Sequence, residues 1–227
     1  MLSTKELFYE QEVCNILKDT TIHQRLEKLK EKTKATGHEH AFDVCSDNRI
    51  TGITEGKKDT VDTRGINRIC KNHPDLIIHS HPYDIAYPSK ADFISDIEYP
   101  PRIANCVYGE KDDKITCFRT SDKLRNKYGP LIKKTLKKLR EIYYIKMENA
   151  TDPEEERRLK EEYENEYNKY KTLLTNIAEE VVSNIYPNLK SIKYPYGKES
   201  DDYDKYIREE PRFGNFGNVW IRDCGKV

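Results

Sequence analysis

The chain has 227 residues, of which 36% are hydrophobic and 35% are charged. This length and this polarity favour one sizeable core with solvated helices over two full cores. Because 40 basic residues balance 40 acidic ones, no net charge draws the protein to nucleic acid or to a membrane surface.

The six cysteines form no Cys-x-x-Cys pair, and the chain is too long for a small disulfide-dense scaffold. We therefore expect buried free thiols in a reducing compartment. The first residues show no basic stretch followed by an apolar run, and no segment is apolar over a membrane-spanning length. These features predict a soluble, cytoplasmic protein with no membrane partner.

Residues 1–37 are predicted to form an N-terminal helical segment. Ser3 or Thr4 can cap its start, apolar residues recur at helical spacing through Leu29, and Gly37 suits a helix C-terminus.

Residues 38–119 are predicted to form a core of strands interleaved with helices. Residues 40–45 alternate as in a half-buried strand, and residues 49–55 follow a turn as a returning strand. Helical spacing over 64–72 precedes a short apolar run at 75–80, typical of a buried strand. A helix starts at Ser89, and two further strands cover 102–108 and 115–119. The fold class is therefore α/β (α+β), a mixed sheet flanked by helices.

Residues 120–185 are predicted to form an antiparallel helical hairpin. The first helix runs from Pro130 and is basic, whereas the second starts at Thr151-Asp152-Pro153 and opens acidic. The hairpin either packs on the core or serves as a partner-binding arm. Residues 186–227 are predicted to be an irregular tail that ends in a strand over 216–223, which can return to the sheet.

One segment carries the residues of a metal site. His79 and His81 lie two apart at the end of a predicted strand, so that their side chains point to the same side. Pro82 stops the strand, a loop follows, and Ser89 caps a helix that carries Asp92 in its first turn. Two imidazoles and one carboxylate suit Zn²⁺ and leave a fourth position for water, as in catalytic zinc sites. The metal ligands are therefore predicted to be His79, His81 and Asp92.

The order His-x-His, seven residues, Ser, two residues, Asp resembles the signature of the JAB/MPN (JAMM) metalloproteases. The resemblance covers about residues 38–119 and implies a JAB/MPN-like fold, a zinc cofactor and hydrolysis of an amide bond. In that family a serine in the position of Ser89 helps to stabilise the oxyanion. The sequence after Gly37 departs from the Gly-rich strand of many members and looks closer to the prokaryotic branches that include RadC-type proteins.

The resemblance also implies an upstream glutamate that acts as general acid and base. Two glutamates stand on strand-like segments before the motif, and Glu39 is favoured over Glu55 because it begins the alternating strand. His38 and His40 flank Glu39 as a second His-x-His pair. No third ligand follows them at a suitable spacing, so they are interpreted as strand residues or as groups that support the site.

Three functions follow from these features. The first is a zinc metallo-isopeptidase or protease with a protein or peptide substrate, often the conjugate of a ubiquitin-like protein in the resembling family. The second is a non-catalytic MPN-type scaffold that binds partners through its hairpin. The third is a RadC-like role with nucleic acid, against which the zero net charge argues.

Overall fold

A mixed seven-stranded sheet forms the centre of the computed structural model, which describes residues 3–62, 69–70, 74–187, 189 and 207–226. The strand order is β2-β1-β3-β4-β5-β7-β6. β3 and β4 are parallel, and every other neighbouring pair is antiparallel. The strands are β1 His40–Val44, β2 Thr54–Glu55, β3 Leu76–His81, β4 Ala104–Gly109, β5 Lys114–Thr120, β6 Gly214–Asn215 and β7 Val219–Gly225. The predicted α+β class is confirmed.

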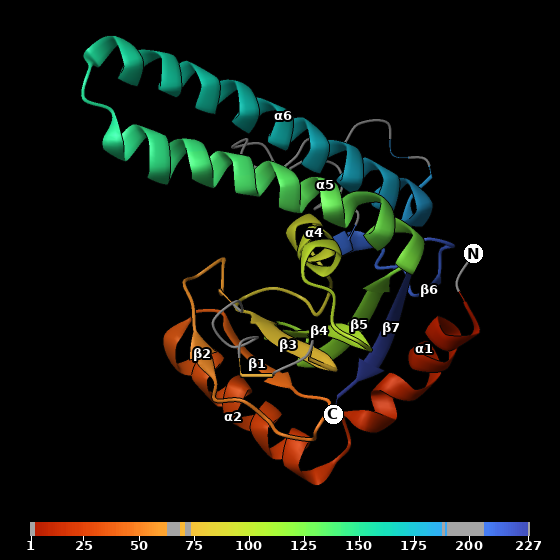
Figure 1. The fold of residues 1–227 in the computed structure, drawn as a ribbon. Helices are drawn as coiled ribbons and strands as arrows, with labels where there is room; N and C mark the ends of the chain where they lie inside the picture. The colour runs from red at the N-terminus through yellow and green to blue at the C-terminus, as the bar shows by residue number, and fades with distance from the viewer. Residues whose placement is uncertain (1–2, 63–68, 71–73, 188, 190–206, 227) are drawn as a thin grey trace.

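Two N-terminal helices cover one face of the sheet, α1 Thr4–Ile16 and α2 Thr20–Thr36 (Figure 1). Ser3 caps α1 as predicted, and Gly37 ends α2 with a φ of 67°, in the left-handed region that glycine adopts without strain. Apolar residues of both helices pack against alternate residues of the strands, among them Phe42, Ile78 and Trp220.

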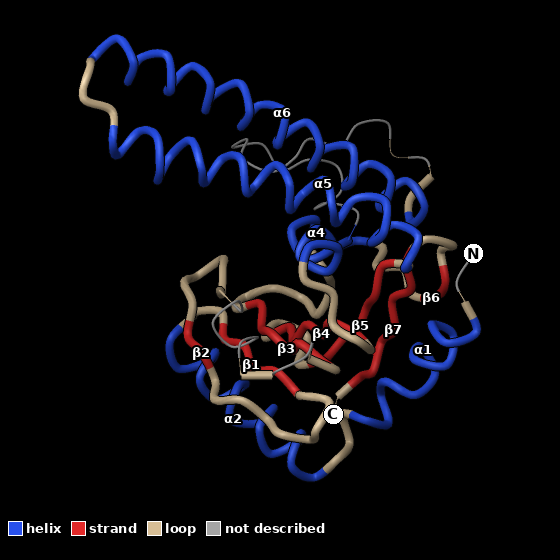
Figure 2. The backbone as a smooth tube through the Cα atoms, in the orientation of Figure 1, coloured by secondary structure: helices blue, strands red, loops and turns tan. Residues whose placement is uncertain are grey.

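Three helices cover the opposite face, α4 Lys90–Glu98, α5 Asp122–Arg140 and α6 Pro153–Ile185 (Figure 2). Their core includes Phe93, Ile132 and Val181, packed on Val107 and Phe118 of the sheet. All five residues of β1 are buried, so the prediction of a half-buried strand at this position was wrong.

The predicted helical hairpin is present, and it extends beyond the edge of the sheet (Figure 1). α5 starts at Asp122, before the predicted start, and contains Pro130 within its length. It continues into a π-helical segment, η1 Glu141–Lys146, and a short 3₁₀ turn, η2 Met147–Asn149. Three ion pairs cross from the basic helix to the acidic one, Lys127–Glu180, Lys138–Glu166 and Lys146–Glu162. Opposite charge therefore supports the pairing of the two helices.

All six cysteines are joined in disulfides, so the prediction of free thiols was wrong. Cys106 and Cys117 face each other across β4 and β5, and Cys14–Cys224 ties α1 to β7. Cys45–Cys70 joins the end of β1 to the segment before β3. Cys14–Cys224 and Cys45–Cys70 join segments that the tertiary arrangement brings together, and Cys106–Cys117 depends on the register of β4 and β5; composition alone reveals none of these pairs.

Two other predictions changed in extent. The strand predicted over 49–55 is reduced to β2 and to one bridge between Val44 and Ile50. The helix expected over 64–72 lies outside the described residues except for a turn at 69–70. The C-terminal strand is confirmed as β7, which pairs with β5, so the sheet takes in residues beyond 38–119.

Within the described chain, no helix combines the length and the apolar character needed to cross a membrane.

Candidate metal centre

The two histidines lie at the end of β3, on the face of the sheet that α4 covers. Alternation along the strand places Ile77, His79 and His81 on this face and Leu76, Ile78 and Ser80 on the other. The neighbouring β1 and β4 hold the strand in register, with Ala41 and Val107 beside His79. Because β3 lies between β1 and β4, its register in the sheet fixes the directions of the two imidazoles.

Asp92 reaches the histidines because Ser89 determines how α4 begins. The Ser89 hydroxyl accepts a hydrogen bond from the Asp92 backbone N–H at 3.2 Å, and the Asp92 carboxylate accepts one from the Ser89 N–H at 2.7 Å. This reciprocal arrangement is a capping box. The predicted helix cap thus also orients the carboxylate of the third candidate ligand.

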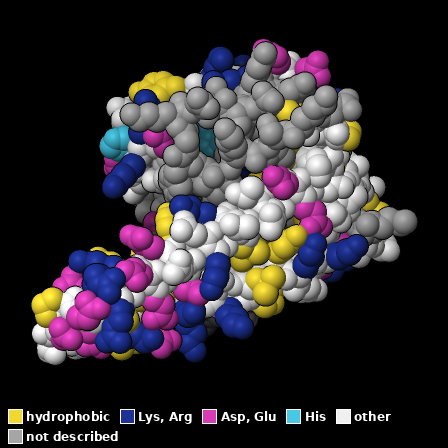
Figure 3. All heavy atoms as spheres, turned by 90° about the horizontal axis from the view of Figure 1, so that it is seen from above, with side chains coloured by type: hydrophobic (Ala, Val, Ile, Leu, Met, Phe, Trp, Pro, Cys, Tyr) yellow, Lys and Arg dark blue, Asp and Glu magenta, His cyan; other side chains and the backbone are white. Residues whose placement is uncertain are grey.

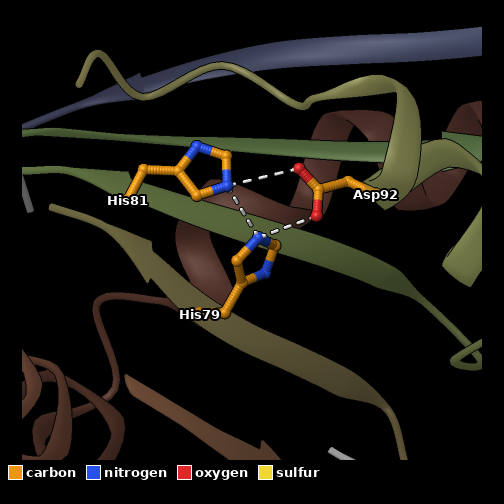
Figure 4. Close-up of side chains that lie close together, drawn as sticks. All are labelled: His79, His81 and Asp92. Carbon is orange, nitrogen blue, oxygen red and sulfur yellow. Dashed lines mark hydrogen bonds and ion pairs between the residues drawn. The ribbon is translucent and has the colours of Figure 1, made fainter. Parts of the chain in front are cut away.

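The structure brings the three predicted ligands together. Nε2 of His79 lies 3.2 Å from Nε2 of His81 and 3.1 Å from Oδ1 of Asp92, and Nε2 of His81 lies 3.3 Å from Oδ2 of Asp92. Figure 4 shows both rings and the carboxylate pointing toward one another from β3 and α4. A tetrahedral zinc ion with bonds of about 2.0–2.1 Å holds its ligand atoms about 3.3–3.4 Å apart. The triangle and its donor atoms fit a metal ion.

The electrostatics of the cluster favour a carboxylate in its charged form. Burial alone would raise the pKa of Asp92, but the charges and hydrogen bonds of His79 and His81 hold that pKa well below its usual value. Burial would lower the pKa of His81, whereas the Asp92 carboxylate raises it overall. A cation in the triangle would take the place of the imidazolium proton as partner of the carboxylate.

Glu39 lies in the same cavity as the histidines. Its backbone pairs with Gly56 and Lys57 just before β1, and its side chain is on the His79 face of the sheet, like that of Ala41. Burial raises the pKa of Glu39 to about 7, against the opposing charges of the two histidines. A carboxyl group with such a pKa can both take and give a proton near neutral pH.

The other candidates lie apart from this cavity. Glu55 is half exposed and bonds His38 at 2.8 Å, away from the triangle. His40 is buried on the opposite face, where its ring lies 3.0 Å from the His38 carbonyl oxygen and its backbone N–H donates to Ser80. The side chain of Ser80 also accepts a bond of 2.7 Å from Thr33 of α2. His40 thus stands in the layer that supports β3, while Glu55 and His38 are surface residues.

The cavity has a volume of about 170 Å³ and is lined by the predicted residues Glu39, His79, His81, Ser89 and Asp92. Sequence reasoning missed other lining residues, among them Asp59, Asn105 and Phe118. Asn105 and Phe118 follow from the strand alternation once the register of β4 and β5 is known. Asp59 belongs to a turn that reads as surface sequence, and no local pattern indicates its place in the cavity.

The loop after β3 is held in a defined shape beside the site. Tyr83 has a φ of 62°, is 65% exposed, and donates its backbone N–H to Glu110 at 3.0 Å. The Ala86 N–H donates to Asp112 in the same β4–β5 turn. A side chain at Gly37 would clash with the ring of Tyr83, since its Cβ would lie 2.2 Å from the Tyr83 hydroxyl. The end of α2 and the β4–β5 turn therefore set the position of this loop.

Comparison with known proteins adds no assignment to this geometry. No protein-family model matches the chain, and no curated protein matches its sequence significantly.

Proposed function

We propose that the protein is a zinc-dependent hydrolase that cleaves an amide bond in a protein or peptide. The observation that carries the proposal is the triangle of His79, His81 and Asp92 beside the buried carboxyl of Glu39. Zinc is chosen because two imidazole nitrogens and one carboxylate oxygen are its usual catalytic ligands. When bound, the ion supplies a Lewis acid and lowers the pKa of water to about 7.

Glu39 moves the proton in this proposal. Its carboxylate takes a proton from the attacking water and delivers it to the leaving amine as the carbon–nitrogen bond breaks. The pKa of about 7 in the buried pocket supports both roles, because neither protonation state is strongly disfavoured at neutral pH.

Ser89 stabilises the negative oxygen that develops on the substrate carbonyl. Its oxygen accepts the hydrogen bond that caps α4, and within the described residues its own O–H hydrogen has no acceptor. That hydrogen is available to the developing oxyanion. Such a donor stabilises the transition state more than the ground state, which is the requirement for catalysis.

The resemblance to the JAMM signature supports an isopeptidase within this class. The ligand spacing, the capping serine and the upstream glutamate agree with that motif, and we propose membership of the JAB/MPN family on these residues. The substrate would then be a lysine-linked conjugate, such as that of a ubiquitin-like protein.

Metal content and hydrolysis test the proposal together. The purified chain should bind about one zinc per molecule, measured by mass spectrometry of the element, and His81→Ala should lose it. His38→Ala is the matched control, since His38 is an exposed member of the other His-x-His pair. Glu39→Gln should keep the zinc and lose hydrolysis of quenched fluorescent α-linked and isopeptide-linked peptides.

Two results would overturn it. Wild-type hydrolysis that survives complete chelation removes the metal from the reaction. A zinc-loaded wild type with no activity on either kind of bond supports the non-catalytic scaffold instead.

The disulfides weaken the prediction of a cytoplasmic location. It rested in part on free thiols, and three disulfides are typical of an oxidising compartment, with the interior of hyperthermophiles as the exception. The location stays a prediction, and fractionation of the native host with a thiol-labelling reagent would test it.

A further inference from the structure

An apolar hollow lies where the end of α4 meets the outer half of the hairpin. It has a volume of about 590 Å³ and is lined by Tyr99, Leu136, Tyr144 and Ile145, with charged residues around them. Tyr144 and Ile145 are 59% and 62% exposed, although both are large apolar side chains. Exposed apolar residues that gather at a hollow commonly mark a binding surface.

A second hollow connects the first to the metal centre. It shares Leu136, Tyr99 and Arg140 with the apolar hollow, and Thr60, Val61 and Ser95 with the cavity of Glu39 and the histidines. The three hollows thus follow one another along α4 with shared lining residues, and we call them together the α4–α5 groove. Its apolar end is Tyr144 and Ile145, and its other end is the metal triangle.

The α5 side of this groove carries three cations that form no ion pair with any residue of the described part of the chain. Within the described residues, Lys133, Lys137 and Arg140 form no ion pair, whereas Lys127 and Lys138 of the same helix pair with acids of α6. The acids Glu98 and Glu141 also line the apolar hollow. Figure 3 shows that both signs of charge are mixed over the free end of the hairpin.

We propose that the α4–α5 groove binds an extended polypeptide segment that carries both apolar and acidic side chains. Tyr144 and Ile145 take its apolar residues, and Lys137 and Arg140 pair with its carboxylates. The segment continues past Thr60 and Ser95, which places a following peptide bond at the metal triangle. This inference rests on the proposed hydrolase function and adds the class of substrate sequence to it.

The test is binding of a defined probe to the full chain with Glu39→Gln, which changes no lining residue of the apolar hollow or of the second hollow. The probe is a fluorescein-labelled peptide of alternating leucine and glutamate, followed by fluorescence anisotropy. It should bind at least tenfold more tightly than the same peptide with lysine in place of glutamate, or serine in place of leucine. Lys137→Glu with Arg140→Glu should weaken binding at least tenfold, and Tyr144→Ser at least threefold.

Two matched controls separate the groove from general effects. Lys134→Glu makes the same charge change on the same helix as Lys137→Glu alone, which is measured beside it. Leu131→Ser removes an exposed apolar side chain from that helix, and neither Lys134 nor Leu131 lines the groove. Both should change binding less than twofold. Weakening by Lys134→Glu equal to that by Lys137→Glu would overturn the proposal, as would equal binding of the acidic and basic peptides.

The groove and the hydrolase can fail independently. If binding follows the pattern above but the wild type cleaves no peptide, the proposed binding groove stands and the proposed hydrolase function is rejected. If hydrolysis depends on zinc but its KM and kcat are unchanged by the substitutions of Lys137, Arg140 and Tyr144, the hydrolase function stands and the proposed binding groove is rejected.

Discussion

Ser89 serves the helix and the proposed reaction through different atoms of one hydroxyl. The oxygen accepts the Asp92 N–H and so caps α4, while the hydrogen remains available to substrate. A substitution that removes the hydroxyl at little cost to the stability of the helix start can separate these two contributions. Glycine suits this purpose because it replaces a serine cap at a cost of only a few tenths of a kcal/mol, whereas alanine costs about 1 kcal/mol.

Ser89→Gly should therefore reduce stability by about 0.3 kcal/mol and lower kcat by about 100-fold through loss of the oxyanion donor. Ser89→Ala should lower both stability and kcat. Chemical unfolding gives the first quantity, and steady-state hydrolysis of a fluorescent peptide gives the second. Ser89→Thr is the control, since it keeps both the cap and the hydroxyl. A Ser89→Gly variant with wild-type kcat would show that the serine acts on the helix alone.

Asp43 gives a prediction for stability against pH. It lies in the middle of β1 with no exposed surface, and burial raises its pKa to about 7. Between pH 4 and pH 7 the unfolded chain loses this proton while the folded chain keeps it, so stability falls as the pH rises. The total is about 4 kcal/mol for a displacement of about three pH units, and the loss from this group is complete by about pH 8.

Asp43→Asn should remove this slope and leave a variant that is more stable than the wild type above pH 7. Urea unfolding at pH 4, 5.5, 7 and 8 measures the effect as the difference between variant and wild type. Glu155→Gln, a change to an exposed acid on α6, is the control and should leave the slope unaltered. A difference that is constant across this range would exclude Asp43 as the titrating group.

The metal residues were predictable because their geometry is local. A strand end and the first turn of the next helix lie within fourteen residues, and the period of a strand together with a capping serine fixes three side-chain directions. Glu39 was located by its place at the start of β1, and the structure puts it in the cavity. Asp59 was missed because only tertiary packing brings its turn to the site.

At the scale of elements, α4 is anchored by the buried ion pair of Asp96 with Arg125, which no local sequence pattern predicts. Asp96 has no exposed surface and receives three hydrogen bonds from Arg125 of α5, from Nη2 at 2.7 and 2.9 Å and from Nε at 3.3 Å. The Thr120 N–H and the Asn105 amide donate to the same carboxylate. The helix that carries Asp92 is thus fixed to α5, β5 and β4 through one side chain.

Arg125→Ala should lower the free energy of unfolding by about 3–5 kcal/mol, because it leaves the Asp96 carboxylate buried without its counter-charge. Arg102→Ala is a matched control. Arg102 also bonds an aspartate through two nitrogens, but it is 53% exposed, so its loss should cost about 1 kcal/mol or less. Equal losses in the two variants, measured by urea unfolding at pH 7, would contradict a special role for the buried pair.

The helices and strands themselves were largely predictable from sequence. Most boundaries are placed correctly by two signals. One is the helix caps at Ser3, Gly37, Ser89 and Asp152, and the other is the spacing of apolar residues, which differs between helices and strands. The failures share a cause. β1 is buried along its whole length, and Cys14–Cys224 and Cys45–Cys70 join segments that only the fold brings together. These properties depend on tertiary contacts and not on local spacing.

At the scale of the whole molecule, the two ends of the chain are fastened to each other. Cys14–Cys224 spans a sequence separation of 210 residues, whereas Cys45–Cys70 spans 25. A longer loop loses more unfolded-state entropy on closure, about 5 kcal/mol for the first and about 3.5 kcal/mol for the second. The link also joins α1 to β7, so it couples a surface helix to the strand between β5 and β6.

Replacement of both Cys14 and Cys224 by alanine should therefore destabilise the protein by about 1–2 kcal/mol more than replacement of Cys45 and Cys70. Urea unfolding without reductant measures both variants, and excess reductant should bring the wild type below either of them because it opens all three bridges. Titration of unreduced wild-type protein with a thiol reagent should find no free thiol. Six reactive thiols after denaturation would restore the original expectation from sequence and remove the link between the chain ends.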